Sequence, residues 1–217
     1  MIEPRPRCWW AGAESPNPDP LMVAYHDEEW GTPVHDDAEL FERLALESFQ
    51  AGLSWSTILR KRENFRAAFR AFDPAVVAAF GLDDRERLMA DAGIVRNGAK
   101  IDATVGNAQG VRALAGEFGS FDAYLVSIVP QPPATLPPEA ISGSLPATTP
   151  VSDALSKDLK KRGFRFVGST IVYSFMQSVG LVDDHLPGCF RYRGQGQPAI
   201  SSGTSPGRGS CSRRRTR

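Results

Sequence analysis

Two cysteines and two histidines, one pair from each end of the chain, are of the types that bind zinc: Cys8, His26, His185 and Cys189. His185 and Cys189 are four residues apart, which can bring both side chains to one centre, although the Pro-Gly pair between them favours a turn. Two thiolates and two imidazoles fill a tetrahedral zinc site and leave no position for water, so such a site would be structural. It would tie the N-terminal segment to the C-terminal end. The alternative is four unrelated core residues.

Glu47 is expected on the apolar side of a helix, where burying a charged carboxylate costs free energy. It follows Leu40 by seven residues and Leu44 by three, and on a helix this places it about 20° from Leu40, on the apolar side. A carboxylate in that position is either paired, for example with Arg43 or Arg96, or used in a functional site. The residue pattern leaves both open.

Aromatic residues close to Glu47 and His26 could line a flat pocket. Tyr25 precedes His26, Trp55 follows Glu47 by eight residues, and Trp10 belongs to the N-terminal segment. Aromatic faces hold a planar ring by stacking, and a carboxylate selects hydrogen-bond donors on the ring edge. The alternative is that these are ordinary core aromatics.

A glycine-containing turn between two helices could grip a phosphate. Gly93 and Gly98 flank it, with Arg96 and Lys100 nearby. Glycines let backbone N–H groups approach a phosphate, and the following helix N-terminus attracts the anion. Such a grip on the DNA backbone carries no sequence information. A plain helix–helix turn is the competing interpretation.

The elements that must position these residues are predicted to be helices, so the fold class is all-α. Caps such as Asp36, Ser54 and Ser152, together with the apolar periodicity, set their expected limits. The predicted helices cover about 37–50, 55–71, 74–80, 83–93, 99–114, 121–128, 152–162 and 169–179. Residues 164–173 could equally form a strand. His35 is expected at the surface.

Two segments differ from this pattern. Residues 130–150 hold seven prolines and are expected to form an extended connection instead of a helix. Residues 194–217 are rich in Arg, Gly and Ser, lack an apolar period, and are expected to be disordered. The predicted organisation is therefore one domain over 1–193 and a tail over 194–217.

The composition excludes several classes of protein. A chain of 217 residues with 41% hydrophobic and 23% charged residues is typical of a globular protein. No apolar run is long enough for a membrane span, and the first residues do not form a secretory signal, so a cytoplasmic protein is expected. In such a protein, three cysteines suggest metal binding or free thiols more than disulfides. The net charge is zero, yet seven arginines and no acids follow Cys189, which leaves 18 basic against 25 acidic residues before it. A body with a net charge of −7 argues against bulk DNA coating and permits one local basic face.

Taken together, these residues and several further blocks resemble the DNA-3-methyladenine glycosylase I family of bacterial alkylation repair. The matching stretches occur in the same order and span roughly residues 7 to 189: 24–31, 50–55, 61–66, 91–94, 153–164, 173–177 and 184–189. Two departures stand out. The turn near Gly93 lacks the Leu-Pro-Gly-Val-Gly motif of the wider superfamily. The sequence after Cys189 does not resemble the short C-terminal segment of the family.

The resemblance implies the fold of helix-hairpin-helix glycosylases and one structural zinc on Cys8, His26, His185 and Cys189. It implies that Glu47 and Tyr25 hydrogen-bond a flipped 3-methyladenine while Trp55 stacks on it, with Trp10 nearby, and that Glu47 is the catalytic residue. The implied DNA contacts are Gly52 and Leu53 in the turn that enters the base stack, and Gly93, Arg96, Gly98 and Lys100 on the phosphates.

The implied activity is hydrolysis of the N-glycosidic bond of 3-methyladenine in alkylated double-stranded DNA by base flipping, which leaves an abasic site. The enzyme is expected to be monofunctional and monomeric, without a nucleotide cofactor or a membrane partner. The alternative is a non-catalytic, zinc-stapled helix-hairpin-helix DNA-binding module, which would not need a buried carboxylate. A zinc hydrolase would need an open metal position, which a Cys2His2 set does not offer.

Overall fold

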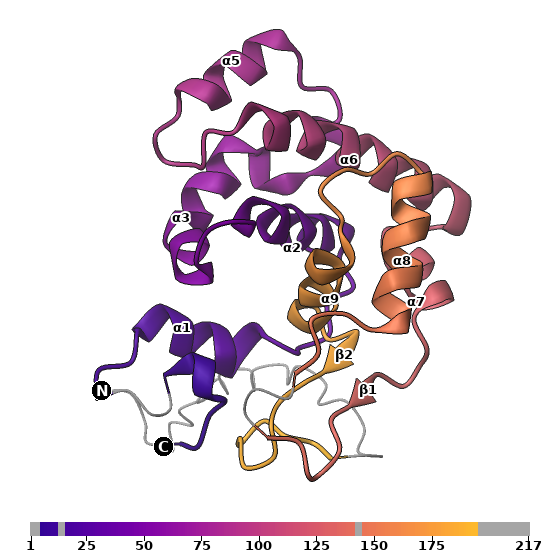
Figure 1. The fold of residues 1–217 in the computed structure, drawn as a ribbon. Coiled ribbons are helices and arrows are strands. Elements are labelled where there is room, and N and C mark those ends of the chain that lie inside the picture. Colours follow the sequence, from indigo (N-terminus) through magenta and orange to yellow (C-terminus); the bar gives the residue numbers. More distant parts are fainter. Residues whose placement is uncertain (1–4, 13–15, 142–144, 195–217) are drawn as a thin grey trace, which may run out of the picture.

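The fold is mostly helical, as a computed structural model shows for residues 5–12, 16–141 and 145–194 (Figure 1). Its helices in chain order are η1 (Trp9–Ala11), α1 (Pro20–Ala24), η2 (Tyr25–Glu29), α2 (Asp37–Gln50), α3 (Trp55–Ala68), η3 (Arg70–Phe72), α4 (Pro74–Val77), α5 (Leu82–Ala90), α6 (Gly98–Phe118), α7 (Phe121–Ile128), α8 (Pro150–Lys161) and α9 (Ser169–Ser178). Two short strands, β1 (Ala134–Thr135) and β2 (Val182–Asp183), form a parallel pair. The all-α expectation is confirmed at this level. The tail prediction for 195–217 lies outside the described residues, and the single domain over 1–193 stays a prediction.

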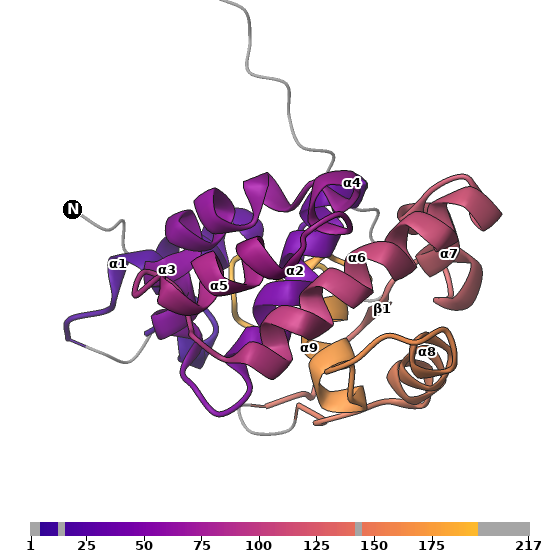
Figure 2. The same ribbon diagram turned by 90° about the horizontal axis from the view of Figure 1, so that it is seen from above.

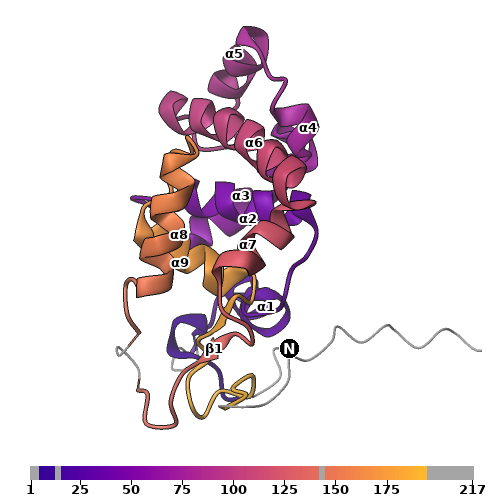
Figure 3. The ribbon, with the colours of Figure 1, turned by 90° about the vertical axis from the view of Figure 1, so that its right-hand side faces the viewer.

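Helix α2 lies at the centre of the fold. It contacts α3, α4, α6, α7 and α9, so every residue from Leu40 to Phe49 is buried. Helices α4, α5 and α6 lie on one side of it, and α1, α7, α8 and α9 on the other (Figure 3). Seen from above, α6 crosses α2 (Figure 2). A helix surrounded in this way has no solvent-facing side, so any polar group on it must find a partner or a cavity.

Several helix limits follow the expected capping chemistry. The Asp36 carboxylate accepts from the backbone N–H of Ala38 and Glu39 at the start of α2, and the Ser54 hydroxyl accepts from Thr57 at the start of α3. Helix α7 has the predicted limits. The predicted helix over 169–179 is also confirmed as α9, so the strand interpretation of 164–173 is wrong.

Other limits differ from the prediction. Helix α8 begins at Pro150, because Thr149 is its cap and Ser152 stands three residues later in the capping box. Helix α5 begins at Leu82, where the Asp84 carboxylate accepts from the Gly81 N–H at 3.3 Å. Helix α6 continues four residues beyond the expected end and stops at Gly119, whose φ of 95° ends the helical path. Helix α3 ends at Ala68 and α4 at Val77, both short of the predicted limits.

The described part of the proline-rich connection is extended, as predicted, and it contains β1. Strand β1 pairs with β2, which comes shortly before the metal-ligand candidate His185. Ala134 pairs with Val182 and Thr135 with Asp183. The preceding turn needs glycine at position 180, because φ is +73° and a Cβ atom would lie 2.7 Å from the backbone nitrogen of Pro33. In the part of the chain that the structure describes, no helix is long and apolar enough to cross a membrane.

Candidate active site and metal centre

A widened helical turn directs two neighbouring side chains to different places. Residues Tyr25–Glu29 form a π-helical turn, closed by the Trp30 N–H donating to the Tyr25 carbonyl at 2.8 Å. Tyr25 lines a cavity, whereas His26 joins a cluster of cysteine and histidine side chains. Such π turns often occur at functional sites. This turn is therefore shared by the two candidate sites.

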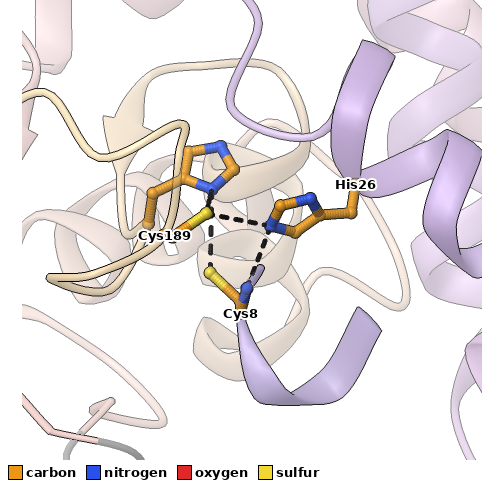
Figure 4. A group of neighbouring side chains, drawn as sticks. Cys8, His26 and Cys189 are labelled. Carbon is orange, nitrogen blue, oxygen red and sulfur yellow. Dashed lines mark hydrogen bonds between the residues drawn. The ribbon is translucent and has the colours of Figure 1, made fainter. Parts of the chain in front are cut away.

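The four metal-ligand candidates meet at one point. One ligand atom from each of Cys8, His26, His185 and Cys189 lies within 4.8 Å of the other three, and all four residues are buried. Figure 4 shows Cys8, His26 and Cys189 converging from three separate segments of the ribbon. The Sγ atom of Cys189 lies 3.3 Å from His26 Nε2 and 3.7 Å from His185 Nδ1. The structure thus brings together residues that are up to 181 positions apart in sequence.

Both imidazoles are held through the nitrogen that faces away from the cluster. His26 Nδ1 lies 2.8 Å from the Asp27 carboxylate, and His185 Nε2 lies 3.1 Å from the Trp30 carbonyl oxygen. An acceptor on the outer nitrogen fixes the ring tautomer and leaves the inner nitrogen free to bind a metal. Gly31 leaves room for this arrangement, because a Cβ there would lie 3.1 Å from His185 Nε2.

The two sulfur atoms are also oriented and electrostatically linked. The backbone N–H of Leu186 donates to Cys8 Sγ and that of Arg191 to Cys189 Sγ, each at 3.4 Å. The hydrogen bond between the two sulfurs holds the pKa of Cys8 above its ordinary value and that of Cys189 below it. Two soft sulfur and two imidazole donors, buried and close together, fit one tetrahedral ion such as zinc.

The second site is a cavity of about 280 Å³ beside the cluster. It is at the small end of the range for ligand pockets, roughly 300–1,000 Å³. Aromatic residues dominate its lining and come from η1, η2, α3 and the segment before Gly31. The lining residues are Trp9, Trp10, Met22, Tyr25, Trp30, Glu47, Gln50, Trp55, Leu145, Ser174 and Gln177. All four base-binding candidates from the sequence therefore line one cavity.

Glu47 presents an unpaired carboxyl group to this cavity. The side chain belongs to a residue that is 5% exposed, and it makes no hydrogen bond or ion pair with any residue that the structure describes. Burial raises the pKa of Glu47 to about 8. The alternative of an ion pair with Arg43 is wrong, because the Arg43 guanidinium pairs with Glu29 at 2.6 Å and Glu39 at 3.0 Å. Arg96, the other suggested partner, is exposed.

A network of charged side chains contacts Tyr25, one of the residues that line the cavity. Glu29 accepts two hydrogen bonds from Arg62, at 2.7 and 2.8 Å, in addition to its contact with Arg43. The Arg43 guanidinium carbon lies 5.9 Å from the Tyr25 ring centre. Burial, and then the neighbouring Glu47, raise the pKa of Tyr25, so its hydroxyl stays protonated and able to donate.

Trp55 stands next to Tyr25, with ring centres 5.2 Å apart and ring planes at 51°. Its indole Nε1–H is buried and has no hydrogen-bond acceptor among the described residues. Trp10 contacts Tyr25 from the other direction at 6.2 Å. All three rings line the cavity, and aromatic side chains of this kind can stack on a planar heterocycle.

The raised pKa of Glu47 predicts how the free energy of unfolding changes with pH. The pKa of Glu47 in the folded protein, about 8, exceeds its ordinary value of 4.5, so the folded protein retains a proton that the unfolded chain loses between these pH values. Glu47 therefore costs stability as pH rises from about 4.5 to about 8. We expect Glu47→Gln to be more stable than wild type above pH 8, by on the order of 3–5 kcal/mol, and equal to it near pH 4.5. Urea unfolding of both proteins across pH measures the difference; two parallel stability curves would contradict the assignment.

Sequence reasoning assigned no role to Ser174 and Gln177, which line the same cavity from α9. Both residues belong to the stretch 173–177, which enters the sequence analysis only as one of the stretches that resemble the family. Their spacing of three residues on a helix places them on one face and was the available signal. Gln177 Nε2 donates to the Asp184 carboxylate at 2.7 Å.

The proposed DNA-inserting turn joins α2 to α3 at the edge of the cavity. Gly52 has a φ of +87°, and Leu53 is 43% exposed, between the cavity-lining residues Gln50 and Trp55. An exposed apolar side chain on a tight turn at the entrance of a pocket is the geometry that a wedge between bases requires.

Lys100 does not lie where a phosphate ligand should. Its side chain belongs to a residue that is 7% exposed, and Nζ donates to the carbonyl oxygens of Phe49 and Ala51 at 3.0 and 2.9 Å. The expected DNA contact of Lys100 is therefore corrected to a structural role, in which the ammonium caps the end of α2. It thereby holds the turn that carries Gly52 and Leu53.

The rest of the predicted phosphate grip stands between α5 and α6. The Gly93 N–H donates to the Asp91 carboxylate at 2.7 Å, and Lys61 Nζ donates to the Gly93 carbonyl at 3.1 Å. Arg96 is exposed, and Gly98 is the first residue of α6. Arg96 and the N-terminus of α6 therefore remain the candidates for contact with an anion.

Known proteins are similar to most of this chain in sequence. The methyladenine glycosylase family matches residues 15–192. DNA-3-methyladenine glycosylase 1 of Escherichia coli (strain K12) is 50% identical over 188 residues, which cover 87% of this chain and 97% of that protein. DNA-3-methyladenine glycosylase of Haemophilus influenzae is 45% identical, over 84% of this chain and 96% of that one.

Solved structures agree with these relatives. A crystal structure of 3-methyladenine DNA glycosylase I superposes with a TM-score of 0.80 at 49% identity, covering 86% of this chain and 100% of the other. A structure of the Staphylococcus aureus protein, solved to explain 3-methyladenine recognition, has a TM-score of 0.77 at 40% identity, covering 83% and 94%.

Proposed function

The chain belongs to the methyladenine glycosylase family, and from that premise we propose that it hydrolyses the N-glycosidic bond of 3-methyladenine in alkylated double-stranded DNA, with Glu47 reading the flipped base. It is a base-excision repair glycosylase, a hydrolase acting on N-glycosyl bonds. The observation that carries the residue-level proposal is the buried Glu47, which has no partner among the described residues and faces an aromatic cavity. A DNA-binding module without catalysis would have no use for such a costly group.

Recognition of the base rests on charge and on hydrogen bonding. A deoxyadenosine methylated at N3 is a cation, whereas a normal nucleotide is neutral. Because Glu47 is 5% exposed, its ionised carboxylate would be poorly screened by solvent, would stabilise the cationic base and would accept from its exocyclic amine. Tyr25 adds a hydroxyl donor for the ring edge, while Trp55 and Trp10 hold the ring by stacking.

Hydrolysis then needs little further assistance from side chains. A cationic base is already a good leaving group: as the N-glycosidic bond breaks, its electron pair goes to the base, which leaves neutral, and the positive charge passes to the deoxyribose. A carboxylate facing the cavity would lower the remaining barrier by stabilising that charge as it develops. Water completes the reaction and leaves an abasic site. No lysine is among the cavity-lining residues that the structure describes, which supports a monofunctional enzyme without a Schiff base.

DNA binding is proposed to use the turn between α2 and α3 and the turn between α5 and α6. Gly52 and Leu53 would enter the space vacated by the flipped base, and Gly93, Arg96 and Gly98 would form the hairpin against the phosphates. This hairpin is the basis for placing the fold in the helix-hairpin-helix superfamily. A monomer acting in the cytoplasm is part of the same proposal; the DNA named for its Escherichia coli relative supports the location.

One zinc ion is proposed to occupy the cluster of Cys8, His26, His185 and Cys189. Four side-chain ligands complete a tetrahedral coordination, so a bound ion would supply a structural crosslink and no chemistry at the base. It would join η2, which carries Tyr25 into the cavity, to the C-terminal segment after β2. The metal would act on the reaction only through the position of these elements.

Product analysis tests the function. Purified protein is incubated with methylated duplex DNA, and the released bases are separated by chromatography. We expect 3-methyladenine as the main product, with abasic sites that stay uncleaved until alkali or a lyase is added. Strand cleavage by the protein alone would contradict the monofunctional reaction, and no released base from a folded, metal-loaded protein would contradict the function.

A further inference from the structure

Asp184 lines a different cavity from Glu47 and binds two side chains of α9. Its carboxylate accepts hydrogen bonds from the Tyr173 hydroxyl and from Gln177 Nε2, the latter at 2.7 Å. Asp184 is 5% exposed, so water does not replace these bonds readily. Tyr173 lines a different cavity, whereas Gln177 lines the cavity that holds Glu47.

The position of Asp184 is fixed on both sides along the chain. It directly follows β2, which pairs with β1, and directly precedes His185 of the metal-ligand cluster. The helix that it contacts is also held in place, because the Gly31 N–H donates to the backbone carbonyl of Gln177 at 3.0 Å. Asp184 and Gln177 therefore meet as two rigidly mounted groups.

This contact decides which end of the Gln177 amide faces away from Asp184. The carboxylate oxygen Oδ2 accepts from both the Tyr173 hydroxyl and Gln177 Nε2, so the amide nitrogen is the end that faces Asp184. The carbonyl oxygen Oε1 is then the end without a partner among the described residues, on a side chain that lines the base cavity. A buried carboxylate thus converts a two-faced amide into a hydrogen-bond acceptor.

We propose that Asp184 is a positioning residue that fixes the Gln177 amide with its oxygen toward the base, so that Gln177 accepts from the exocyclic amine of 3-methyladenine and selects it over 3-methylguanine. Adenine carries an amine donor at C6, where guanine carries a carbonyl acceptor. An oxygen facing that position attracts the first and repels the second. This inference rests on the proposed function and adds a specificity determinant to it.

The test compares kcat/KM for release of 3-methyladenine and of 3-methylguanine from the same methylated duplex. Asp184→Leu removes the acceptor, so nothing fixes the amide, and we expect the ratio of the two values to fall about tenfold. Tyr173→Phe is the matched control, because it removes the other hydrogen bond to Asp184 and leaves that of Gln177 in place; its ratio should equal that of wild type. The ratio does not depend on the fraction of folded protein, so a loss of stability alone would not change it.

A reversed pair provides the rescue. In Asp184→Asn combined with Gln177→Glu, the Asn amide donates to a carboxylate at position 177, which again presents an acceptor to the cavity, and the net charge is unchanged. We expect this double variant to regain the wild-type ratio. Should Asp184→Leu fail to fold, Gln177→Met removes the acceptor itself and should show the same tenfold fall.

A wild-type ratio in Asp184→Leu or Gln177→Met, or no recovery in the double variant, would overturn the inference. Absence of 3-methyladenine release by the wild-type protein would instead overturn the proposed function, so the two failures are distinguishable.

Discussion

Glu47→Gln is expected to lower the rate of 3-methyladenine release from methylated duplex DNA by about a hundredfold or more. The amide keeps the size of the side chain and one acceptor oxygen, but it loses the negative charge that the buried carboxylate would place beside the cationic base. Single-turnover release at pH 8.5, with enzyme in excess over lesions, measures this loss without a contribution from product release.

Glu42→Gln is the matched control for that variant. Glu42 is buried on the same helix, but it is paired with Arg66 at 2.9 Å and does not line the cavity. We expect Glu42→Gln to destabilise the protein and to keep the single-turnover rate per folded molecule. If both variants lost activity equally, the effect of Glu47→Gln would reflect damage to α2 and not the loss of a base-reading charge.

Cys189→Ser is expected to lose the metal and the stability together. Because the cluster joins the segment of Cys8 to the segment after β2, loss of one ligand removes a crosslink between the two ends of the domain. We expect the free energy of unfolding to fall by more than about 4 kcal/mol and zinc content to fall from one ion per chain to near zero. Elemental analysis and urea unfolding measure the two quantities on the same sample.

The third cysteine supplies the control for this change. Cys211 lies outside the residues that the structure describes and is not one of the four proposed ligands, so we expect Cys211→Ser to keep both the metal and the stability. A Cys189→Ser protein that has lost zinc but unfolds at the wild-type urea concentration would show that the cluster does not hold the fold together.

Local chemistry made most helix positions predictable. Asp36 and Ser54 cap the helices that carry Glu47 and Trp55, and the apolar period around Leu40 placed Glu47 on a buried face. The misplaced limits have a common physical cause. A cap is chosen by the hydrogen bonds that a residue can make in three dimensions. Thr149 therefore caps α8 in place of Ser152, and the helix expected from residue 83 begins at Leu82 instead.

The candidate site was predictable where residue type alone limits the chemistry. Two thiols and two imidazoles have few uses together, and a carboxylate on an apolar helix face is rarely accidental. Properties that depend on tertiary contacts were not accessible. Lys100 is a residue type that often binds phosphate, but its ammonium group caps the end of α2 instead. The contact between Asp184 and Gln177 arises only because the tertiary fold brings the segment after β2 against α9.

The pH dependence of kcat/KM for 3-methyladenine release tests the role of Glu47 most directly. This parameter reports the ionisation of the free enzyme, where burial raises the pKa of Glu47 to about 8. We expect the wild-type value to rise about tenfold per pH unit below pH 8 and to level off above it, while Glu47→Gln stays low and shows no such rise. A wild-type profile that is flat through pH 8, or a Glu47→Gln protein that follows the wild-type curve, would contradict an ionised Glu47 as the group that reads the cationic base.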